Sequence, residues 1–197
     1  LAQLGFKLTQ TLPPATEHAA KQMLDDFFDP NLEYSVEKYA TTRNRPAKDS
    51  TSKLSMHLRM GTISPRTCLQ AAVNALENPL SASQRRGVDK WLAELAWREY
   101  YNQIAFHFPH ALNGALNPKF DAIGWRNDHA EFEQWKLGKT GYPLVDAGQR
   151  QLNTEAWMHN RVRMVTASFL IKHLLVDWRW GERYFIQQLR DGDPPSN

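Results

Sequence analysis

Cysteine is nearly absent from the sequence, and no hydrophobic run is long. Cys68 is the only cysteine among 197 residues, which excludes a disulfide framework and fits a cytoplasmic protein. It lies in an apolar stretch, so we expect it in the core. No apolar run approaches the ~18 residues of a membrane-spanning helix, and no signal peptide is recognisable. The sequence therefore predicts a cytoplasmic protein without membrane attachment.

Strand signals and metal-ligand patterns are also missing. No segment of useful length shows the period-two alternation of a half-buried strand. The seven histidines and the scattered acidic residues show no metal-ligand spacing. The GKTG stretch at 138–141 invites a phosphate-loop interpretation, but Glu133 stands where that motif needs its first glycine. The sequence thus predicts an all-α fold, no metal site, and a turn at 138–141.

Neither sign of charge dominates. Lys and Arg number 24 against 21 Asp and Glu, a formal net charge of +3, which permits nucleic-acid binding without requiring it. Seven tryptophans are many for this length, and a large helical core explains them more simply than a function does.

Apolar spacing and capping residues predict a series of helices. Ser64 followed by Pro65 is a strong start signal, with Ser as N-cap and Pro in the first turn. The stretch 39–50 has no apolar periodicity and is expected to be a loop. The predicted helices are 16–28, 55–60, 65–76, 83–106, 130–137, 143–152, 157–178 and 180–189.

Two of these helices carry charged or amide groups among aromatic ones. At helical spacing one face carries Trp91, Glu94, Arg98 and Tyr101, with Trp97 beside Glu94. In isolation, a surface ion pair between Glu94 and Arg98 is the simpler interpretation. The flanking tryptophans argue against it, because surface pairs are seldom framed by large apolar rings.

The WMHNRVRM stretch at 157–164 behaves in the same way. Trp157, Asn160, Arg163 and Met164 fall on one face of the predicted helix, with Arg161 to the side. Burying such polar groups without partners would cost several kcal/mol. If this face and the Trp91 face line a common cavity, the cavity would suit a large, planar, hydrogen-bonding ligand.

Two further segments carry polar groups of uncertain use. Thr51, Ser52 and Ser55, with the backbone N–H groups of a helix start, would suit a phosphate, although plain N-capping is the favoured alternative. Asp191 and Asp193 could form a turn, bind a ribose, or pair with an arginine such as Arg163. The sequence leaves these alternatives open.

Taken together, these segments resemble the FAD-binding helical domain of the photolyase/cryptochrome family, and most closely the class I cyclobutane pyrimidine dimer photolyases. FAD, light and DNA follow from this resemblance and not from the periodicity. The matching segments are Tyr39 with Arg43, TSKLS at 51–55, WLAELAWREYY at 91–101, GKTGYPLVDAGQRQL at 138–152, WMHNRVRM at 157–164 and DGDPPSN at 191–197.

The resemblance implies roles for individual residues. Trp125 and Trp178 match members of an electron-transfer tryptophan chain, and Glu94 and Asn160 would stabilise charge on the substrate bases. The implied FAD-binding residues are Tyr39, Thr51, Ser52, Lys53, Leu54, Ser55, Trp91, Glu94, Arg98, Asn160, Arg163, Asp191, Asp193 and Asn197. The implied contacts to DNA or to the dimer are Arg43, Glu94, Trp97, Asn160, Arg161 and Met164.

The implied activity is light-driven repair of cyclobutane pyrimidine dimers in DNA. Excited reduced FAD would donate an electron to a dimer flipped out of the duplex, in a monomeric carbon–carbon lyase. Residues 1–38 would be a linker and first helix after a missing antenna domain with a second chromophore. Residues 39–197 would be a helical catalytic domain lacking its C-terminal part. A cryptochrome-like photoreceptor and a helical DNA-binding domain without flavin are the alternatives.

Overall fold

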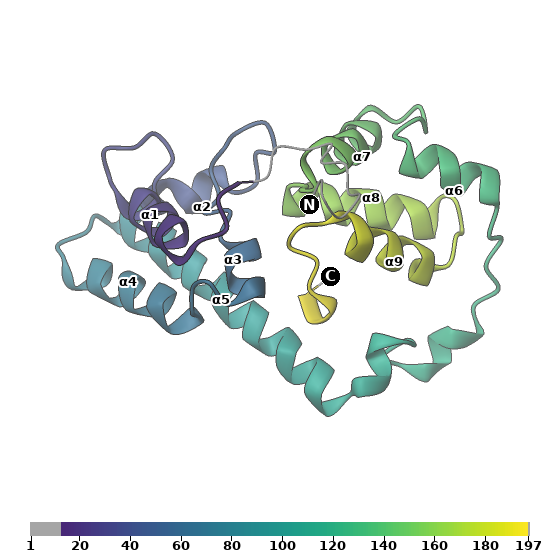
Figure 1. Ribbon diagram of the computed structural model, residues 1–197, viewed down its shortest axis with the longest axis horizontal. Coiled ribbons are helices and arrows are strands. Elements are labelled where there is room, and N and C mark those ends of the chain that lie inside the picture. The colour runs from purple at the N-terminus through teal and green to yellow at the C-terminus, as the bar shows by residue number, and fades with distance from the viewer. Residues whose placement is uncertain (1–12, 197) are drawn as a thin grey trace, which may run out of the picture. The chain divides into compact units, whose positions relative to one another are not determined.

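The computed structural model describes residues 13–196 as helices joined by turns and loops, with no strand among them (Figure 1). The all-α prediction is therefore confirmed. The chain divides into two compact units, residues 14–109 and residues 110–195, called here the N-unit and the C-unit. Asn197, an expected flavin contact, lies outside the described residues, as do residues 1–12.

The N-unit is built around the long helix α5, whose start is fixed by a capping box between Ser81 and Gln84. α5 passes so close to η2 that a Cβ atom at Gly87 would lie 2.2 Å from the carbonyl oxygen of Val36. Cys68 is fully buried as expected, and burial raises its pKa to about 11. The elements are α1 (Glu17–Phe28), η2 (Val36–Lys38), α2 (Tyr39–Thr42), α3 (Ser55–Met60), α4 (Pro65–Glu77) and α5 (Ala82–His107).

The C-unit packs its helices around Trp135, which is fully buried and donates its indole N–H to the carbonyl oxygen of Thr166 at 3.0 Å. α7 and α8 approach closely at Gly148, where a Cβ atom would lie 2.4 Å from a methyl group of Val162. The elements are η3 (Pro109–Leu112), η4 (Pro118–Ala122), α6 (His129–Lys136), α7 (Pro143–Glu155), α8 (Asn160–Lys172), α9 (Trp178–Gln188) and η5 (Pro194–Ser196).

Most predicted helices are present within a few residues of their expected ends. Ser64 caps α4 by accepting the N–H of Thr67, with Pro65 in the first turn. The GKTG stretch forms a turn before α7, with positive φ angles at Gly138 and Gly141. Within residues 13–196, no helix is both long enough and apolar enough to cross a membrane.

The prediction of one helix over 157–178 was wrong. α7 ends at Glu155, and Ala156 follows it in a left-handed conformation. The chain is not helical again until α8, which His159 caps because its Nδ1 accepts the N–H of Arg161. α8 ends at Lys172, and the chain turns at Leu175, where φ is +53°. Neither break contains glycine or proline, the usual stop signals, so the apolar pattern runs through them unmarked.

The prediction of a loop throughout 39–50 was also wrong at its start. Residues 39–42 form the single-turn helix α2. The hydroxyls of Thr41 and Thr42 both donate to the carbonyl oxygen of Lys38 at 2.9 Å, which closes the turn. One turn is too short to show apolar periodicity, so the pattern could not reveal it.

Gln149 is a polar residue buried in the core of the C-unit. Its side chain is fully buried on α7, and neither its amide nitrogen nor its amide oxygen has a hydrogen-bond partner among the described residues. A buried amide without partners costs about 1–3 kcal/mol on mutational scales. We therefore expect Gln149→Met, nearly equal in size, to raise the free energy of unfolding by about 1 kcal/mol. Urea denaturation tests this, and a stability loss would mean that the amide is satisfied in solution.

Asp146 holds the GKTG turn against α7. Its carboxylate accepts hydrogen bonds from the Thr140 N–H at 2.7 Å, the Thr140 hydroxyl at 2.6 Å and the Gly141 N–H at 3.0 Å. Burial by itself would raise the pKa of Asp146, but these bonds and nearby Arg150 together lower it below its ordinary value. The ionised form is thus favoured by folding.

This shift predicts how stability depends on pH. Because the folded-state pKa of Asp146 is depressed, its contribution is complete above the unfolded-state value of about 3.9 and is lost as pH falls through the folded-state value. Below about pH 4, the wild-type chain should therefore lose free energy of unfolding more steeply than Asp146→Asn. Chemical denaturation at several pH values measures this, and equal slopes for the two chains would contradict it.

Candidate functional site

The N-unit presents an ion pair that the sequence pattern did not reveal. Glu94 of α5 is bonded to Arg43, which follows α2, and not to Arg98 as the simple interpretation expected. The Arg43 side chain is 8% exposed and that of Glu94 is 30% exposed. Arg98 instead donates to the carbonyl oxygen of Leu58 at 3.4 Å. The mixed stripe on α5 is therefore tied to α2 and α3.

The segment before α3 brings hydroxyl groups to a half-buried position. Thr51, Ser52 and Lys53 are half-buried, and Lys53 has a positive φ of 50°. The Ser52 hydroxyl oxygen accepts the indole N–H of Trp91 at 3.4 Å, so its own proton can still be donated. Leu54, the N-cap residue of α3, offers no side-chain cap. The N-cap position of α3 itself is therefore not filled by one of the hydroxyl residues of this segment.

Two of the expected ligand contacts in the N-unit are core residues. Tyr39 is 7% exposed and Trp91 is 3% exposed. Both rings pack against Phe27, at centroid distances of 5.8 Å and 5.6 Å. Their cofactor-binding roles stay predictions, and their observed role is to support the segment that carries Ser52 and the ion pair of Glu94.

Further along α5, an aromatic surface is exposed. The side chain of Trp97 is 50% exposed and stacks on Tyr101 with a ring-centroid distance of 5.8 Å and an interplanar angle of 27°. Tyr100 meets both rings edge-on. Such a rigid aromatic group has the chemistry of a platform for nucleobases. Helical spacing pointed to Trp97 but not to Tyr100, because Tyr100 lies off the stripe of Trp91 and Glu94.

In the C-unit, the expected pair of Arg163 and Asp191 is present. One terminal nitrogen of Arg163 contacts both carboxylate oxygens of Asp191, at 2.8 Å and 3.0 Å, and its Nε donates to the carbonyl oxygen of Met158 at 2.8 Å. The Asp191 side chain is only 3% exposed. Two of the three alternatives for Asp191 are therefore observed, because it pairs with an arginine and also lies in a turn in which the Gly192 N–H donates to the carbonyl oxygen of Leu189 at 3.1 Å. The ribose-binding alternative stays a prediction.

The rest of the WMHNRVRM stretch is divided between core and surface. Trp157 precedes α8, so its expected place on the helical stripe was wrong. Asn160 and Met164 lie one turn apart on α8 and are exposed. Arg161 is half-buried, and its guanidinium lies 3.3 Å from the sulfur of Met164. At the start of α8, Arg161 is thus half-buried and contacts Met164, whereas the side chain of Asn160 is exposed to solvent.

The two tryptophans of the expected electron-transfer chain lie in the C-unit. Trp125 is half-buried, and its indole nitrogen has no hydrogen-bond partner among the described residues. Trp178 begins α9, directly after its N-cap Asp177, and the guanidinium carbon of Arg179 lies 4.9 Å from the centre of its ring. Both residues are half-buried and neither belongs to the buried core of the unit.

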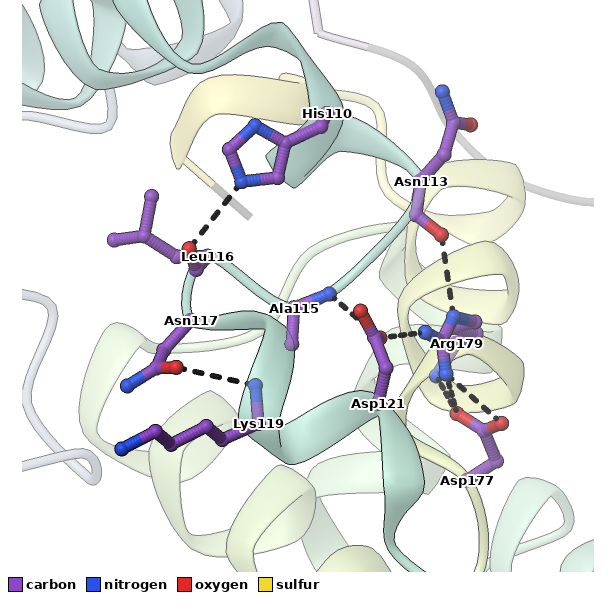
Figure 2. A network of polar contacts seen from close by, with 9 residues as sticks. All are labelled: His110, Asn113, Ala115, Leu116, Asn117, Lys119, Asp121, Asp177 and Arg179. Carbon is purple, nitrogen blue, oxygen red and sulfur yellow. Dashed lines mark hydrogen bonds and ion pairs between the residues drawn. The ribbon is translucent and has the colours of Figure 1, made fainter.

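Arg179 ties the segment after η3 to the start of α9, as Figure 2 shows. Its guanidinium bonds the carboxylates of Asp121 and Asp177 and the carbonyl oxygen of Asn113. A hydrogen bond from the Ala115 N–H, together with the bond to Arg179, lowers the pKa of Asp121. No local pattern in the sequence indicates this network, because Asn113 and Asp121 are 66 and 58 positions from Arg179.

The expected site residues therefore fall into two groups, one in each unit. Glu94, Arg43 and Ser52 belong to the N-unit, whereas Arg163 and Asp191 belong to the C-unit. The common cavity expected for the two stripes stays a prediction. Among the described residues, no group of three or more histidine, cysteine, aspartate or glutamate side chains could hold a metal ion.

Comparison with known proteins identifies the family. Residues 91–197 match the FAD binding domain of DNA photolyase. The chain belongs to this family. It is 42% identical over 188 residues to the deoxyribodipyrimidine photo-lyase of Neurospora crassa, covering 95% of this chain and 30% of that protein. It is 45% identical over 181 residues to the enzyme of the same name from Agrobacterium fabrum, covering 92% of this chain and 36% of that protein.

Solved structures agree with the family assignment. A bacterial class III photolyase from Agrobacterium tumefaciens matches with a TM-score of 0.84 and 44% identity, over 92% of this chain and 36% of that one. A cryptochrome from Synechocystis sp. matches with a TM-score of 0.86 and 35% identity, over 97% of this chain and 39% of that one. The chain thus spans about a third of the curated relatives' length, and both photolyases and cryptochromes share its fold.

Proposed function

We propose that this chain is the FAD- and DNA-binding part of a light-driven deoxyribodipyrimidine photo-lyase that repairs cyclobutane pyrimidine dimers. The observation that carries the proposal is the identity of 42% and 45% to two proteins of that name over more than nine-tenths of the chain. The assignment to class I rests only on residues such as Asn160 and Met164 and stays a prediction, as does the absence of a membrane partner.

The donor groups of the N-unit fit the phosphates of FAD. The hydroxyls of Thr51 and Ser52 and the ammonium of Lys53 are all half-buried donors on one short segment, and such donors suit phosphate oxygens. Lys53 already contacts Asp49 at 2.8 Å, an exposed pair that it can exchange for phosphate at little cost. When bound, FAD in its reduced form supplies the electron that light drives onto the dimer.

The C-unit carries a second set of groups that suit a flavin. Arg163 is held by Asp191 and by the Met158 carbonyl oxygen, so its orientation is fixed before any ligand binds. Asn160 leaves its amide exposed on the first turn of α8, and Asp193 is half-buried after Asp191. We assign these groups to the cofactor, with Ser55, Leu54 and Arg98 as further contacts from the N-unit.

The exposed groups suit a damaged DNA strand. Trp97 with its aromatic neighbours would stack on a flipped base, Met164 would pack against it, and Arg161 would contact a phosphate. Binding should weaken with salt in proportion to the phosphate contacts made.

Glu94 would act differently from the role first expected of it. Its carboxylate is paired with Arg43 and can therefore only accept hydrogen bonds. A developing negative charge on a base carbonyl needs a donor, which the amide of Asn160 can supply and Glu94 cannot. We therefore assign Glu94 to an N–H group of the base, and Asn160 to the carbonyl.

Flavin content distinguishes the proposal from a helical DNA-binding domain without cofactor. We expect the protein containing this chain to purify with bound FAD that is visible by absorbance and released as FAD on denaturation. A colourless protein that binds no added FAD would favour the domain without flavin. The antenna chromophore, the monomeric state, the cytoplasmic location and the boundary at residue 38 stay predictions.

Trp178→Phe tests the electron-transfer chain. Phenylalanine is far harder to oxidise than tryptophan, so photoreduction of oxidised flavin by an external reductant should be strongly slowed. Repair by enzyme whose flavin is reduced beforehand should be unchanged, because that step does not use the chain. Flavin absorbance during illumination measures the first quantity, and normal photoreduction in the variant would remove Trp178 from the chain.

A cryptochrome-like photoreceptor is the second candidate function. The likeness to the Synechocystis cryptochrome, with a TM-score of 0.86, favours it as strongly as the fold favours a photolyase. The two functions differ in whether the protein with bound flavin splits a dimer in the light.

A further inference from the structure

The ion pair of Arg43 and Glu94 leaves one carboxylate oxygen unused. The Nη1 group of Arg43 bonds Oε1 of Glu94, and the ammonium of Lys90 lies 3.9 Å from the same Oε1. Among the described residues, Oε2 of Glu94 makes no hydrogen bond and no ion pair. Since the Glu94 side chain is 30% exposed, Oε2 is the atom available to a ligand.

Arg43 is built into the N-unit more firmly than Glu94. Its side chain is 8% exposed, and its guanidinium lies 5.2 Å from the ring centre of Tyr39, a core residue. Burial, the largest single influence, opposes its charge, but the hydrogen bond to Glu94 and the electrostatic interactions with Tyr39 and Glu94 together raise the pKa of Arg43 above its ordinary value. The cation is therefore enclosed, permanently charged and already paired.

We propose that Arg43 is a positioning residue: it grips Oε1 of Glu94 so that Oε2 is presented in a fixed orientation to an N–H donor of the ligand base. This role rests on the proposed function, because it takes the ligand to be a flipped pyrimidine dimer. A carboxylate held at one oxygen loses little further side-chain freedom when it binds, and this preorganisation favours the correct ligand over others.

The alternative role, a direct phosphate contact, predicts a different behaviour. A phosphate-binding arginine releases counterions from DNA. Its loss should reduce the slope of log binding constant against log salt concentration by about 1, the value of one phosphate contact, for damaged and undamaged DNA alike. Arg43 is 8% exposed and its charge is compensated by Glu94, so we expect little counterion release from it. The two roles can therefore be separated by salt titration.

The experiment compares Arg43→Met, Glu94→Gln, the double variant and the matched control Lys90→Met. Lys90→Met also removes a positive charge near Oε1 of Glu94, but that charge lies 3.9 Å away on an exposed side chain. Dissociation constants are measured at several salt concentrations for two duplexes of one sequence, with and without a single thymine dimer. Flavin content and circular dichroism confirm that each variant is folded and loaded.

If Arg43 positions Glu94, Arg43→Met should weaken binding of the dimer duplex by about tenfold, the effect of one hydrogen bond to a charged group. Glu94→Gln should weaken binding of the dimer duplex by a similar factor, and the double variant should bind that duplex no more weakly than either single variant. The affinity for the undamaged duplex and the salt dependence of the dissociation constants should not change in these variants. Lys90→Met should still bind the dimer duplex more tightly than the undamaged one. A loss equal for both duplexes, with a shallower salt slope, would overturn the proposal in favour of a phosphate contact.

A second measurement does not depend on DNA. A double-mutant cycle of unfolding with the same variants should show coupling between positions 43 and 94 and none between 90 and 94. Should Arg43→Met fail to fold, Arg43→Lys replaces it, since lysine keeps the charge but not the rigid fork. Absence of coupling would overturn the positioning role itself. If positions 43 and 94 are coupled but the wild-type protein binds the two duplexes equally, the proposed function is overturned instead.

Discussion

Asp191→Ala should destabilise the C-unit by about 3 kcal/mol or more, the range for breaking a buried ion pair. The carboxylate is 3% exposed and contacts Arg163 through both oxygens. Without it, the guanidinium of Arg163 would remain half-buried beside the start of α8 with its charge uncompensated. Because Arg163 is an assigned flavin contact, the variant should also lose FAD at lower denaturant concentrations.

Urea denaturation followed by circular dichroism measures this effect. Glu133→Ala is the matched control in the same unit, since Glu133 forms an exposed ion pair with Lys136 at 2.6 Å. Removing such a surface pair should cost less than about 1 kcal/mol. Equal stability losses in the two variants would mean that the pair of Arg163 and Asp191 does not hold α8.

Glu94→Ala should impair both binding of a dimer and repair. Its Oε2 makes no hydrogen bond or ion pair among the described residues, and the loss of one charge-assisted hydrogen bond to a base should cost about 1.5–3 kcal/mol of binding free energy. The variant also leaves Arg43, which is 8% exposed, without its counter-charge. We therefore expect a second effect, a loss of about 3 kcal/mol in the free energy of unfolding of the N-unit.

The two effects of Glu94→Ala are separated by working well below the unfolding temperature and recording flavin content alongside dimer affinity. Glu99→Ala on the same helix serves as control, because Glu99 is exposed and contacts only Gln103 among the described residues. Full affinity and full repair in Glu94→Ala with FAD bound would remove Glu94 from the site.

The sequence predicted best where local signals decide the structure. Ser64, Pro65 and the apolar spacing that follows fix α4 within a residue or two, because caps and periodicity act over a few positions. The break at Leu175 could not be predicted. A non-glycine residue there adopts a left-handed conformation, and its carbonyl oxygen is bonded by the N–H groups of Arg126 and Asn127. Contacts across nearly 50 positions leave no local pattern.

In the candidate site too, local features could be predicted from the sequence and contacts distant in sequence could not. Periodicity marked Glu94 and Arg163 as charged groups in apolar surroundings, which is a local observation. Pairing of Asp191 with an arginine such as Arg163 was one of three alternatives that the sequence left open, and the structure contains that pair. For Glu94, the sequence offered a surface pair with Arg98, against which the flanking tryptophans argued, but it did not point to Arg43, because the one-turn helix α2 that precedes Arg43 is too short to recognise. Ion pairs distant in sequence depend on tertiary packing.

The most direct test of the central claim is the splitting of a thymine dimer in light. The protein containing this chain, with its flavin reduced, is mixed with a dimer-containing oligonucleotide and illuminated with near-ultraviolet or blue light. A matched sample is kept dark. We predict loss of the dimer and recovery of two intact thymines in the light only. Bound, reducible FAD with no dimer splitting under illumination would contradict the account and favour a photoreceptor.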